Sequence, residues 1–229
     1  MTLRSISICA VIAVTTIASV PLIGLASEVG EFTFTVLRNG NPVGQHRIAM
    51  QVDGDRVQIS EATDIEVRIA SIPVYRFEYR GRQVWEGGRV VRITGRTNDN
   101  GKLLEIGVRP AGDGYFRTVN GRVDRFGTSS RVFALWNMDT LKYRHFFSVV
   151  DDETFEASFQ YVGREKLMVA GQTLDVDHYR MMGTERRELW FDTAAHLVRL
   201  KMRRRGSEIE YIRDQTTPSA PSVSCAEEC

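Results

Sequence analysis

The sequence predicts an all-β fold: a curved antiparallel sheet, or open half-barrel, of meandering hairpins, with one short helix at most. Short segments alternate apolar and polar side chains with a period of two, which is typical of strands that bury one face. The alternation is clearest in residues 74–108, where three aromatic side chains share one face of the first strand: Tyr75, Phe77 and Tyr79. Turns rich in Gly, Asn and Asp separate such segments along most of the chain, because these residues tolerate the positive φ of tight hairpins.

Strands are expected between successive turn signals. They lie at residues 31–37, 43–52, 56–63 and 65–69, in three strands of residues 74–108 separated by turns at 86–88 and 98–101, and at residues 155–161, 174–182, 188–192, 196–203 and 208–212. Residues 110–131 are rich in Gly and polar side chains and predict short, irregular strands. Residues 132–147 fit a strand pattern poorly, and Asn137 could either cap a short helix or belong to an irregular crossover.

The composition is that of a globular domain with a substantial core. Hydrophobic residues make up 42% and charged residues 26% of the 229 residues, and a chain of this length commonly forms one all-β domain. We expect that single antiparallel β domain to span residues 27–214. The net charge of +1 argues against a nucleic-acid partner, since nucleic-acid-binding domains usually carry a strong basic excess.

The N-terminus has the layout of a secretory signal peptide. A short basic start precedes an apolar run, residues 6–25, which Pro21 and Gly24 interrupt. Small residues suit cleavage after Ala26. We therefore expect residues 1–26 to be removed and the mature protein to be periplasmic. The alternative is an uncleaved signal anchor, because the apolar run is nearly long enough to span a bilayer.

The C-terminal residues 215–229 are rich in Pro, Ser and Thr and predict a disordered tail. They hold two of the three cysteines, Cys225 and Cys229, and the third, Cys9, lies in the apolar N-terminal run. No disulfide framework therefore supports the β domain. In an oxidising periplasm Cys225 and Cys229 could form a small disulfide, whereas a metal site there would need two further ligands.

Several turn and core motifs are similar to those of a family of exported bacterial proteins of unknown function. They are residues 39–44 (NGNPVG), 85–88 (WEGG), 97–101 (TNDNG), 136–137 (WN), 190–192 (WFD) and 197–200 (LVRL). The family resembles curved antiparallel half-barrels of the lipoprotein-carrier kind (LolA/LolB-like), which bind acyl chains in a concave apolar face. The resemblance implies the fold over nearly all of the mature chain, and it implies no catalytic residues. One departure is that no lid helix is readable in this sequence.

No catalytic or metal-binding constellation is readable, so we expect a non-enzymatic protein without a cofactor. The Gly-x-Ser-x-Gly pattern of serine hydrolases is absent, and the four histidines lie singly, without the paired spacing of zinc sites. Strand alternation places Asp175 and Asp177 on the opposite face from His178, which favours a charged outer surface over a ligand cluster. The acidic run 151–153 lacks the further oxygen ligands and the Gly of a calcium loop, which favours a hairpin turn.

Arginines concentrate in the first and last meanders. The first carries Arg76, Arg80, Arg82, Arg89, Arg92 and Arg96, and the last carries Arg199, Lys201, Arg203, Arg204 and Arg205. Such a basic stripe could make peripheral contact with an anionic membrane surface or an envelope protein. The favoured alternative is a solvated sheet face whose charge is neutralised by cross-strand ion pairs with nearby carboxylates, at Glu78, Glu86, Glu105, Glu188 and Glu210.

The remaining candidate site is a set of aromatic side chains that could bind a ligand. Its members are Tyr75, Phe77, Tyr79, Trp85, Trp136 and Trp190. In an open half-barrel they would line an apolar concave groove, and in a closed sandwich they would form the core; both arrangements demand the same alternation. The leading hypothesis is a periplasmic protein that binds a hydrophobic small molecule or lipid in that face. The alternative is an envelope-scaffolding protein with a solid core that docks a partner through its basic sheet face.

Overall fold

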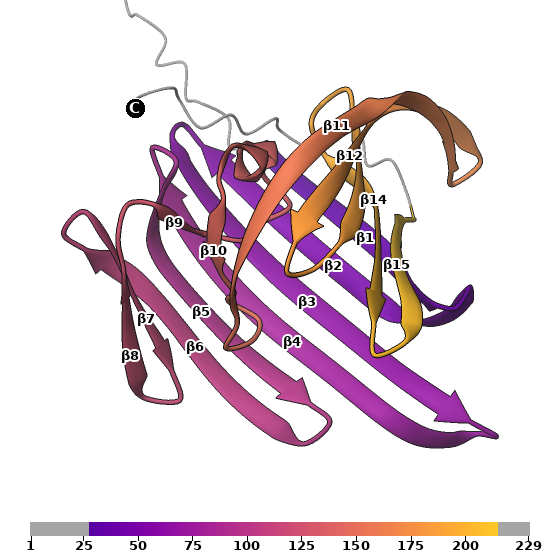
Figure 1. The fold of residues 1–229 in the computed structure, drawn as a ribbon, viewed down its shortest axis with the longest axis horizontal. Coiled ribbons are helices and arrows are strands. Elements are labelled where there is room, and N and C mark those ends of the chain that lie inside the picture. Colours follow the sequence, from indigo (N-terminus) through magenta and orange to yellow (C-terminus); the bar gives the residue numbers. More distant parts are fainter. Residues whose placement is uncertain (1–27, 215–229) are drawn as a thin grey trace, which may run out of the picture.

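Alternating apolar side chains fold residues 28–214, the part of the chain that the computed structural model describes, into one sheet of 15 strands (Figure 1). The strands are β1 (Glu28–Arg38), β2 (Asn41–Asp53), β3 (Arg56–Ile69), β4 (Ile72–Glu86), β5 (Arg89–Asp99), β6 (Lys102–Ala111), β7 (Gly114–Val119), β8 (Arg122–Phe126), β9 (Ser130–Val132), β10 (His145–Phe147), β11 (Thr154–Val169), β12 (Gln172–Gly183), β13 (Arg187–Asp192), β14 (Leu197–Arg204) and β15 (Ser207–Arg213). A single 3₁₀ turn, η1 (Met138–Lys142), lies between β9 and β10.

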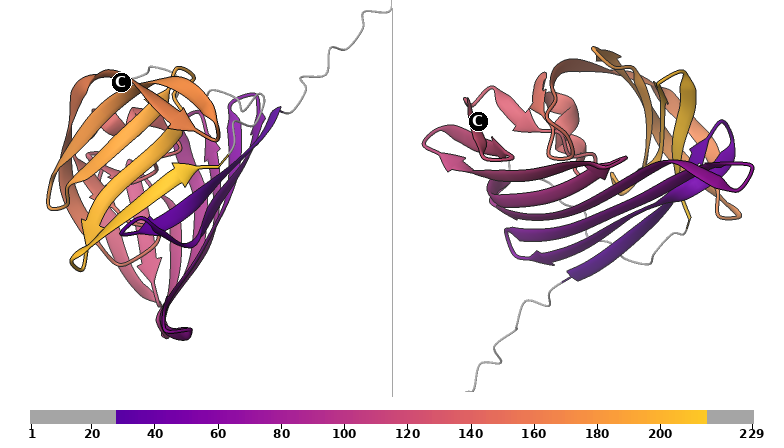
Figure 2. Two further views of the ribbon diagram at one scale, coloured as in Figure 1. Left: turned by 90° about the vertical axis from the view of Figure 1, so that its right-hand side faces the viewer. Right: turned by 90° about the horizontal axis from the view of Figure 1, so that it is seen from below.

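The first and last strands, β1 and β15, lie side by side in the middle of the sheet. Strand β1 pairs with β2 on one side and with β15 on the other, so the spatial order runs β8-β7-β6-β5-β4-β3-β2-β1-β15-β14-β13-β12-β11-β10-β9. Two wings therefore extend from the β1–β15 pair, one made of β1–β8 and one of β9–β15. Successive strands are neighbours within each wing, and the two wings curl toward each other (Figure 2). The result is a barrel-like sheet whose two edge strands, β8 and β9, are not hydrogen-bonded to each other.

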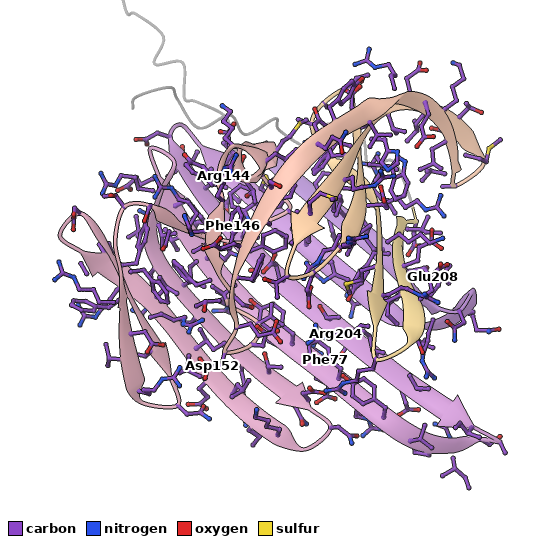
Figure 3. The ribbon with its side chains drawn as sticks, viewed as in Figure 1. Phe77, Arg144, Phe146, Asp152, Arg204 and Glu208 are labelled. Atoms are coloured by element: carbon purple, nitrogen blue, oxygen red, sulfur yellow. The ribbon has the colours of Figure 1, made fainter. Side chains whose placement is uncertain are left out.

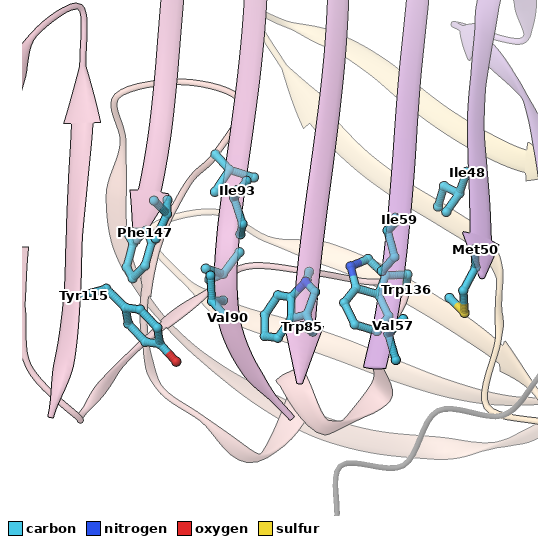
Figure 4. Close-up of a cluster of buried hydrophobic side chains, with 14 of the residues drawn as sticks. Ile48, Met50, Val57, Ile59, Trp85, Val90, Ile93, Tyr115, Trp136 and Phe147 are labelled. Atoms are coloured by element: carbon cyan, nitrogen blue, oxygen red, sulfur yellow. The ribbon is translucent and has the colours of Figure 1, made fainter. Parts of the chain in front are cut away.

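The largest hydrophobic core lies on the inner face of the β1–β8 wing. Alternate residues of β1–β7 point inward and are almost fully buried, and they include Phe34, Met50, Ile59 and Ile93 (Figure 4). A second row of apolar side chains, from Val132 to Val149, packs on top of them. That row belongs to the segment that joins the two wings, so the wings share one core.

The joining segment, residues 130–153, crosses the inner face and is held there by specific contacts. The Thr97 hydroxyl donates a hydrogen bond to the Val150 carbonyl. Residue 95 must be glycine, since a Cβ there would lie 2.8 Å from the Val149 carbonyl oxygen. The Asn137 side chain caps η1 by accepting a hydrogen bond from the backbone N–H of Asp139, at 2.8 Å.

A buried arginine closes the seam between the two wings. Arg117 on β7 has only 2% of its side chain exposed, and its guanidinium donates to the carbonyls of Ser148 and Glu153, at 3.4 and 3.1 Å. It also forms ion pairs with Asp124 of β8 and Asp152 of the joining segment, both at 3.1 Å. Side-chain contacts, rather than backbone pairing, therefore hold the β8 edge against the opposite wing. Stacking of Phe126 on Phe147, with ring centroids 4.4 Å apart, completes the seam.

The predicted all-β, curved antiparallel fold is confirmed, and three details differ. Residues 56–69 form one strand, because Thr63 faces inward and Asp64 outward, which continues the alternation. Residues 114–126 form a regular hairpin, β7–β8, instead of irregular strands. Strands β9 and β10 pair in parallel, the one exception among the pairs of this sheet. The expected short helix begins after Asn137, as its capping side chain suggested.

Three predictions fall on residues that the structure does not describe. The expected signal peptide, residues 1–26, the expected tail, residues 215–229, and the proposed Cys225–Cys229 disulfide all lie outside residues 28–214. Within residues 28–214, no helix is long and apolar enough to cross a bilayer.

Replacing the buried guanidinium should destabilise the protein measurably. We expect Arg117→Met to lower the free energy of unfolding by about 3 kcal/mol, at the lower end for a broken buried ion pair, because Arg122 remains beside both carboxylates. Chemical denaturation gives this value directly. Arg125→Met is the matched control, since Arg125 is 66% exposed and should change stability by no more than about 0.5 kcal/mol. Equal effects of the two substitutions would contradict the role of Arg117.

Candidate functional site

The structure distributes the six aromatic residues predicted to bind a ligand over several surroundings. Trp85 and Trp136 pack edge to face in the main core, with ring centroids 5.3 Å apart, and are 8% and 7% exposed. Tyr79 is 1% exposed, and its ring lies over Gly81 and Gly95, where a Cβ would collide with it. These three side chains are therefore packed core residues in this structure.

The other three aromatic residues lie away from that core. Trp190 stacks on His178, with centroids 4.4 Å apart, in a smaller cluster of the other wing. Tyr75 and Phe77 are half-buried near the beginning of β4, where Figure 3 labels Phe77. Burial and a hydrogen bond with Asp99 raise the pKa of Tyr75 to about 12, so its hydroxyl stays protonated. The structure thus brings Trp85 and Trp136 together and leaves the remaining aromatic residues apart.

The concave face of the sheet is filled by the protein's own joining segment. Val132, Ala134, Trp136 and Phe147 of this segment are each at most 7% exposed and pack directly on the inner residues of β1–β7. Close packing of this kind leaves few voids large enough for a ligand. Trp85 and Trp136, which were predicted to line a groove, are therefore part of the packed core.

A short polar chain runs through the inner face beside the aromatic residues. The Trp85 indole N–H donates to the Gln83 side-chain oxygen, at 2.9 Å, and the Gln83 amide donates to the Glu61 carboxylate, also at 2.9 Å. The Tyr79 hydroxyl donates a longer bond, 3.4 Å, to the same carboxylate. Burial raises the pKa of Glu61. The chain satisfies polar groups that would otherwise be costly to bury.

His46 is a histidine whose titration is strongly perturbed by burial. It sits between the rings of Phe34 and Tyr211, and its Nδ1 is 2.8 Å from the Thr63 hydroxyl oxygen. Burial lowers the pKa of His46 from 6.5 to about 4. The ring is therefore neutral at physiological pH.

A hollow with a distinct chemistry lies on the outer face of the β1–β8 wing. It measures about 1050 Å³ and follows two neighbouring cross-strand rows of the sheet. One row is Arg47, Ala62, Arg80, Arg96, Glu105 and Asn120, and the other is Glu31, Ala49, Ser60, Arg82, Thr94, Gly107 and Thr118. We call these residues the outer hollow. Small side chains and long charged ones both line it.

Positive charge is concentrated at the centre of the outer hollow. Arg80 and Arg96 are directly opposite each other on β4 and β5, an arrangement of like charges that destabilises a sheet. Asp64 neutralises part of this charge through ion pairs with Arg80, at 2.6 Å, and Arg47, at 3.6 Å. Arg82 and Arg96 form no ion pair with any carboxylate of residues 28–214.

The hypothesis that nearby carboxylates neutralise the first meander is wrong for four of its arginines. Arg82, Arg89, Arg92 and Arg96 lack ion pairs within the described part of the chain, while the expected carboxylates are engaged elsewhere or not at all. Glu86 pairs with Arg56 and Glu78 contacts Asn98, whereas Glu105 faces Arg96 across β5 and β6 without an ion pair. In the last meander the hypothesis is confirmed for Glu210, which pairs with Arg199. Lys201 pairs with Glu208, whereas Glu188 pairs with Arg180 of β12, outside the last meander.

The other acidic and histidine clusters have structural partners. Asp177 pairs with Arg164, while His178, on the opposite strand face as predicted, contacts Glu188 at 2.6 Å. Asp152 of the acidic run pairs with Arg117 and Arg122. No group of three or more His, Cys, Asp or Glu residues is placed to hold a metal ion in the region between residues 28 and 214.

The sequence indicated the arginines of the outer hollow but not the hollow itself. The small residues that line it come from five different strands, and nothing in the local sequence of Ala49, Ala62 or Gly107 links them. Only the register of the whole wing aligns them in two rows. A comparison of the sizes of outward-facing residues on neighbouring predicted strands could have indicated the hollow.

The fold defines this protein as barrel-like and all-β, with a filled concave face. A crystal structure described as a beta-barrel-like protein of domain of unknown function DUF1849, from Brucella abortus, is similar to it, with a TM-score of 0.54 and 5% sequence identity, over 82% of this chain and 96% of that one. At that identity the likeness shows the fold alone.

The chain belongs to the family described as domain of unknown function DUF6134, whose model matches residues 34–214. No curated protein sequence matches the chain. The expected membership of a family of unknown function is thus confirmed, whereas the resemblance to lipoprotein carriers is not confirmed by these comparisons.

His46 should make stability depend on pH. Its folded-state pKa of about 4 lies below the ordinary 6.5, so the unfolded state binds a proton first as the pH falls. The free energy of unfolding should therefore drop by about 3 kcal/mol between pH 6.5 and 4 and then level off. Denaturation curves of the protein and of His46→Gln at several pH values test this.

The raised pKa of Glu61 acts in the opposite direction, since it reduces stability as the pH rises above 4.5,. This contribution is common to both proteins, so the difference between them isolates His46. A constant difference across pH 4 to 7 would contradict the buried neutral histidine.

Proposed function

We propose that this protein is a non-catalytic binding protein that docks an anionic partner, one that bears phosphate or carboxylate groups, in the outer hollow. The observation that carries the proposal is the concentration of guanidinium groups without carboxylate partners, centred on Arg82 and Arg96. Arg80 and Arg96 lie directly opposite each other, and like charges in such positions lower the stability of a sheet. An anion that binds between them relieves this repulsion, which adds to its affinity.

The composition of the outer hollow suits such a ligand. Guanidinium groups bind phosphate and carboxylate through paired, charge-assisted hydrogen bonds. The exposed hydroxyls of Ser60 and Thr94 lie in the same row as Arg82 and can bind further polar groups of the ligand. The hollow's volume, about 1050 Å³, is at the upper end of the range of ordinary ligand pockets.

The proposal places the partner on the outer face because the inner face is occupied. Val149 and Val150 of the joining segment contact Gly95 and Thr97 on the inner side of β5. The same strand presents Arg96 on its outer side. This arrangement supports the hypothesis of a solid core with a basic docking face.

We further propose that the protein acts in the periplasm. The support is the sequence pattern of residues 1–26, with its basic start, apolar run and small residues before the expected cleavage site,. Fractionation of expressing cells, with mass determination of the recovered chain, tests this compartment. A chain that keeps residues 1–26 and stays with the cytoplasmic fraction would refute it.

A second candidate function is the binding of a hydrophobic small molecule or lipid in the concave face. One observation favours it: the Trp136 indole N–H is buried without a hydrogen-bond partner, an arrangement that costs stability. A joining segment with such a defect is easier to displace from the inner face. Binding would then require the segment to leave the core and the ligand to take its place.

Removing the two unpaired arginines should weaken anion binding. We expect Arg82→Gln/Arg96→Gln to reduce affinity at least tenfold, because each guanidinium contributes about 1.5–3 kcal/mol when it binds a charged group. Calorimetric titration with inorganic phosphate, glycerol phosphate and vesicles that contain phosphatidylglycerol measures the loss and distinguishes a free phosphate from a lipid headgroup.

Arg144→Gln is the matched control for this experiment. Arg144 is exposed and unpaired among the described residues, but it lies before β10, away from the outer hollow (Figure 3). The control should bind like the unmodified protein. Equal affinities for all three proteins, or no binding of any anion by the unmodified protein, would refute the outer hollow as the site.

The second candidate is tested by the lipid that accompanies the purified protein. If the concave face binds lipid, native mass spectrometry of protein from its own host should find a stoichiometric hydrophobic ligand. Filling by the joining segment predicts none. A lipid recovered from the protein and lost in a Trp136→Phe variant would favour the second candidate over the first.

A further inference from the structure

The hairpin of β3 and β4 extends beyond its neighbours in the sheet. Strand β2 pairs with β3 only as far as Ile65, and β5 pairs with β4 only from Phe77 onward. On either side of the hairpin, residues 66–75 therefore have no hydrogen-bonded neighbour strand, while the Arg76 carbonyl accepts a hydrogen bond from the Asn100 backbone N–H in the β5–β6 turn, at 2.8 Å. Four to five residues of each strand extend past these last pairs, which corresponds to roughly 13–16 Å at the rise of a strand. Figure 1 shows this tip at the lower right of the sheet.

The end of this hairpin is apolar and exposed. Ile69 and Ile72 are a cross-strand pair and are 63% and 66% exposed, and Val74 is 47% exposed. Hairpin tips usually carry Asn or Gly at the two turn positions, which have positive φ. Here they are Ala70 and Ser71, with φ of 46° and 69°. The positive φ of both turn residues would favour Gly or Asn. The tip instead carries small, uncharged residues between its two isoleucines.

Basic groups surround the tip one step back from its end. Arg68 and Arg76 are more than half exposed and both pair with the single carboxylate of Glu66. This group of three residues keeps a net positive charge. An apolar end followed by a cationic collar matches the order of an acyl region and an anionic headgroup layer.

The shape of the tip argues against a protein partner. Stable protein interfaces bury wide, complementary surfaces, whereas this tip is a narrow projection of three apolar side chains. Pairing with another strand is also disfavoured, since Pro73 lacks a backbone N–H and blocks one edge of the hairpin,. A lipid interface needs neither a wide surface nor a free strand edge, because it closes around single side chains.

We propose that the tip of the β3–β4 hairpin, Ile69 to Val74, inserts into the interfacial region of a lipid bilayer, with Arg68 and Arg76 at the headgroup level. The inference is separate from the proposed outer hollow. Arg80 is eight residues from Ile72 along β4, roughly 26 Å away at the rise of a strand, so the hollow stays above the membrane when the tip is inserted. The protein would then stand on a membrane surface with its anion-binding face accessible from the side.

Vesicle binding of the whole chain tests the insertion. We expect Ile69→Ser/Ile72→Ser to bind vesicles of phosphatidylcholine and phosphatidylglycerol at least tenfold more weakly than the unmodified protein, since each buried isoleucine contributes strongly to transfer from water. Met168→Ser is the matched control, because Met168 is 67% exposed near the tip of another hairpin, β11–β12. Thermal unfolding should be the same for all three proteins, as these side chains are exposed.

A fluorescent reporter makes the result independent of any other membrane-binding segment. The three native tryptophans are at most 8% exposed, so a tryptophan introduced by Ile72→Trp reports on the tip alone. Its emission should shift to the blue on vesicle binding and be quenched by lipids with brominated acyl chains, and Met168→Trp should show neither effect.

Three results would overturn the proposal. The first is an Ile72→Trp emission that does not respond to bound vesicles. The second is equal vesicle binding by the unmodified protein and Ile69→Ser/Ile72→Ser. The third is a dimer in the absence of vesicles, detected by analytical ultracentrifugation and abolished by the same double substitution, because the tip would then bind a second copy of the chain.

Discussion

The placement of the joining segment on the inner face depends on one buried cation. Arg117 pairs with carboxylates of both wings, Asp124 on β8 and Asp152 in the segment, and it donates hydrogen bonds to two carbonyls of the segment. A buried guanidinium is costly to desolvate and is tolerated only with several well-placed acceptors. Its presence at the seam therefore fixes how far the two wings approach and closes a sheet whose edges never pair.

This closure determines which surfaces can bind. Curved antiparallel sheets often hold ligands on their concave side, but here residues 132–149 contribute a second layer of core side chains at that position. We therefore propose binding on the outer face, where two cross-strand rows combine small side chains with arginines, and at the protruding β3–β4 tip. Both features cost stability in isolation, through like-charge repulsion and apolar exposure, and the proposed partners would offset that cost by covering them.

Much of the fold was predictable from sequence, because a period of two and its turn residues are local signals. They located nearly every strand of both wings and the capped turn at Asn137. They failed where the outcome depends on distant pairing. The polar pair Thr63–Asp64 suggested a break, yet the two side chains simply continue the alternation. The filling of the concave face was not predictable, since Trp85 and Trp136 have the same pattern in a groove and in a core. The outer hollow required the register of seven strands, β1 to β7.

Hydrogen exchange of residues 132–149 tests the central claim, that the joining segment is a permanent part of the core. The backbone N–H of Phe133 donates to the Phe147 carbonyl, at 3.2 Å, and the Phe133 ring packs edge to face on the buried ring of Phe146. The account predicts that this amide exchanges only through global unfolding, as slowly as the amides of β3 and β4. Exchange that is orders of magnitude faster than in those strands, in a protein otherwise folded, would contradict it and return the concave face to consideration as the binding site.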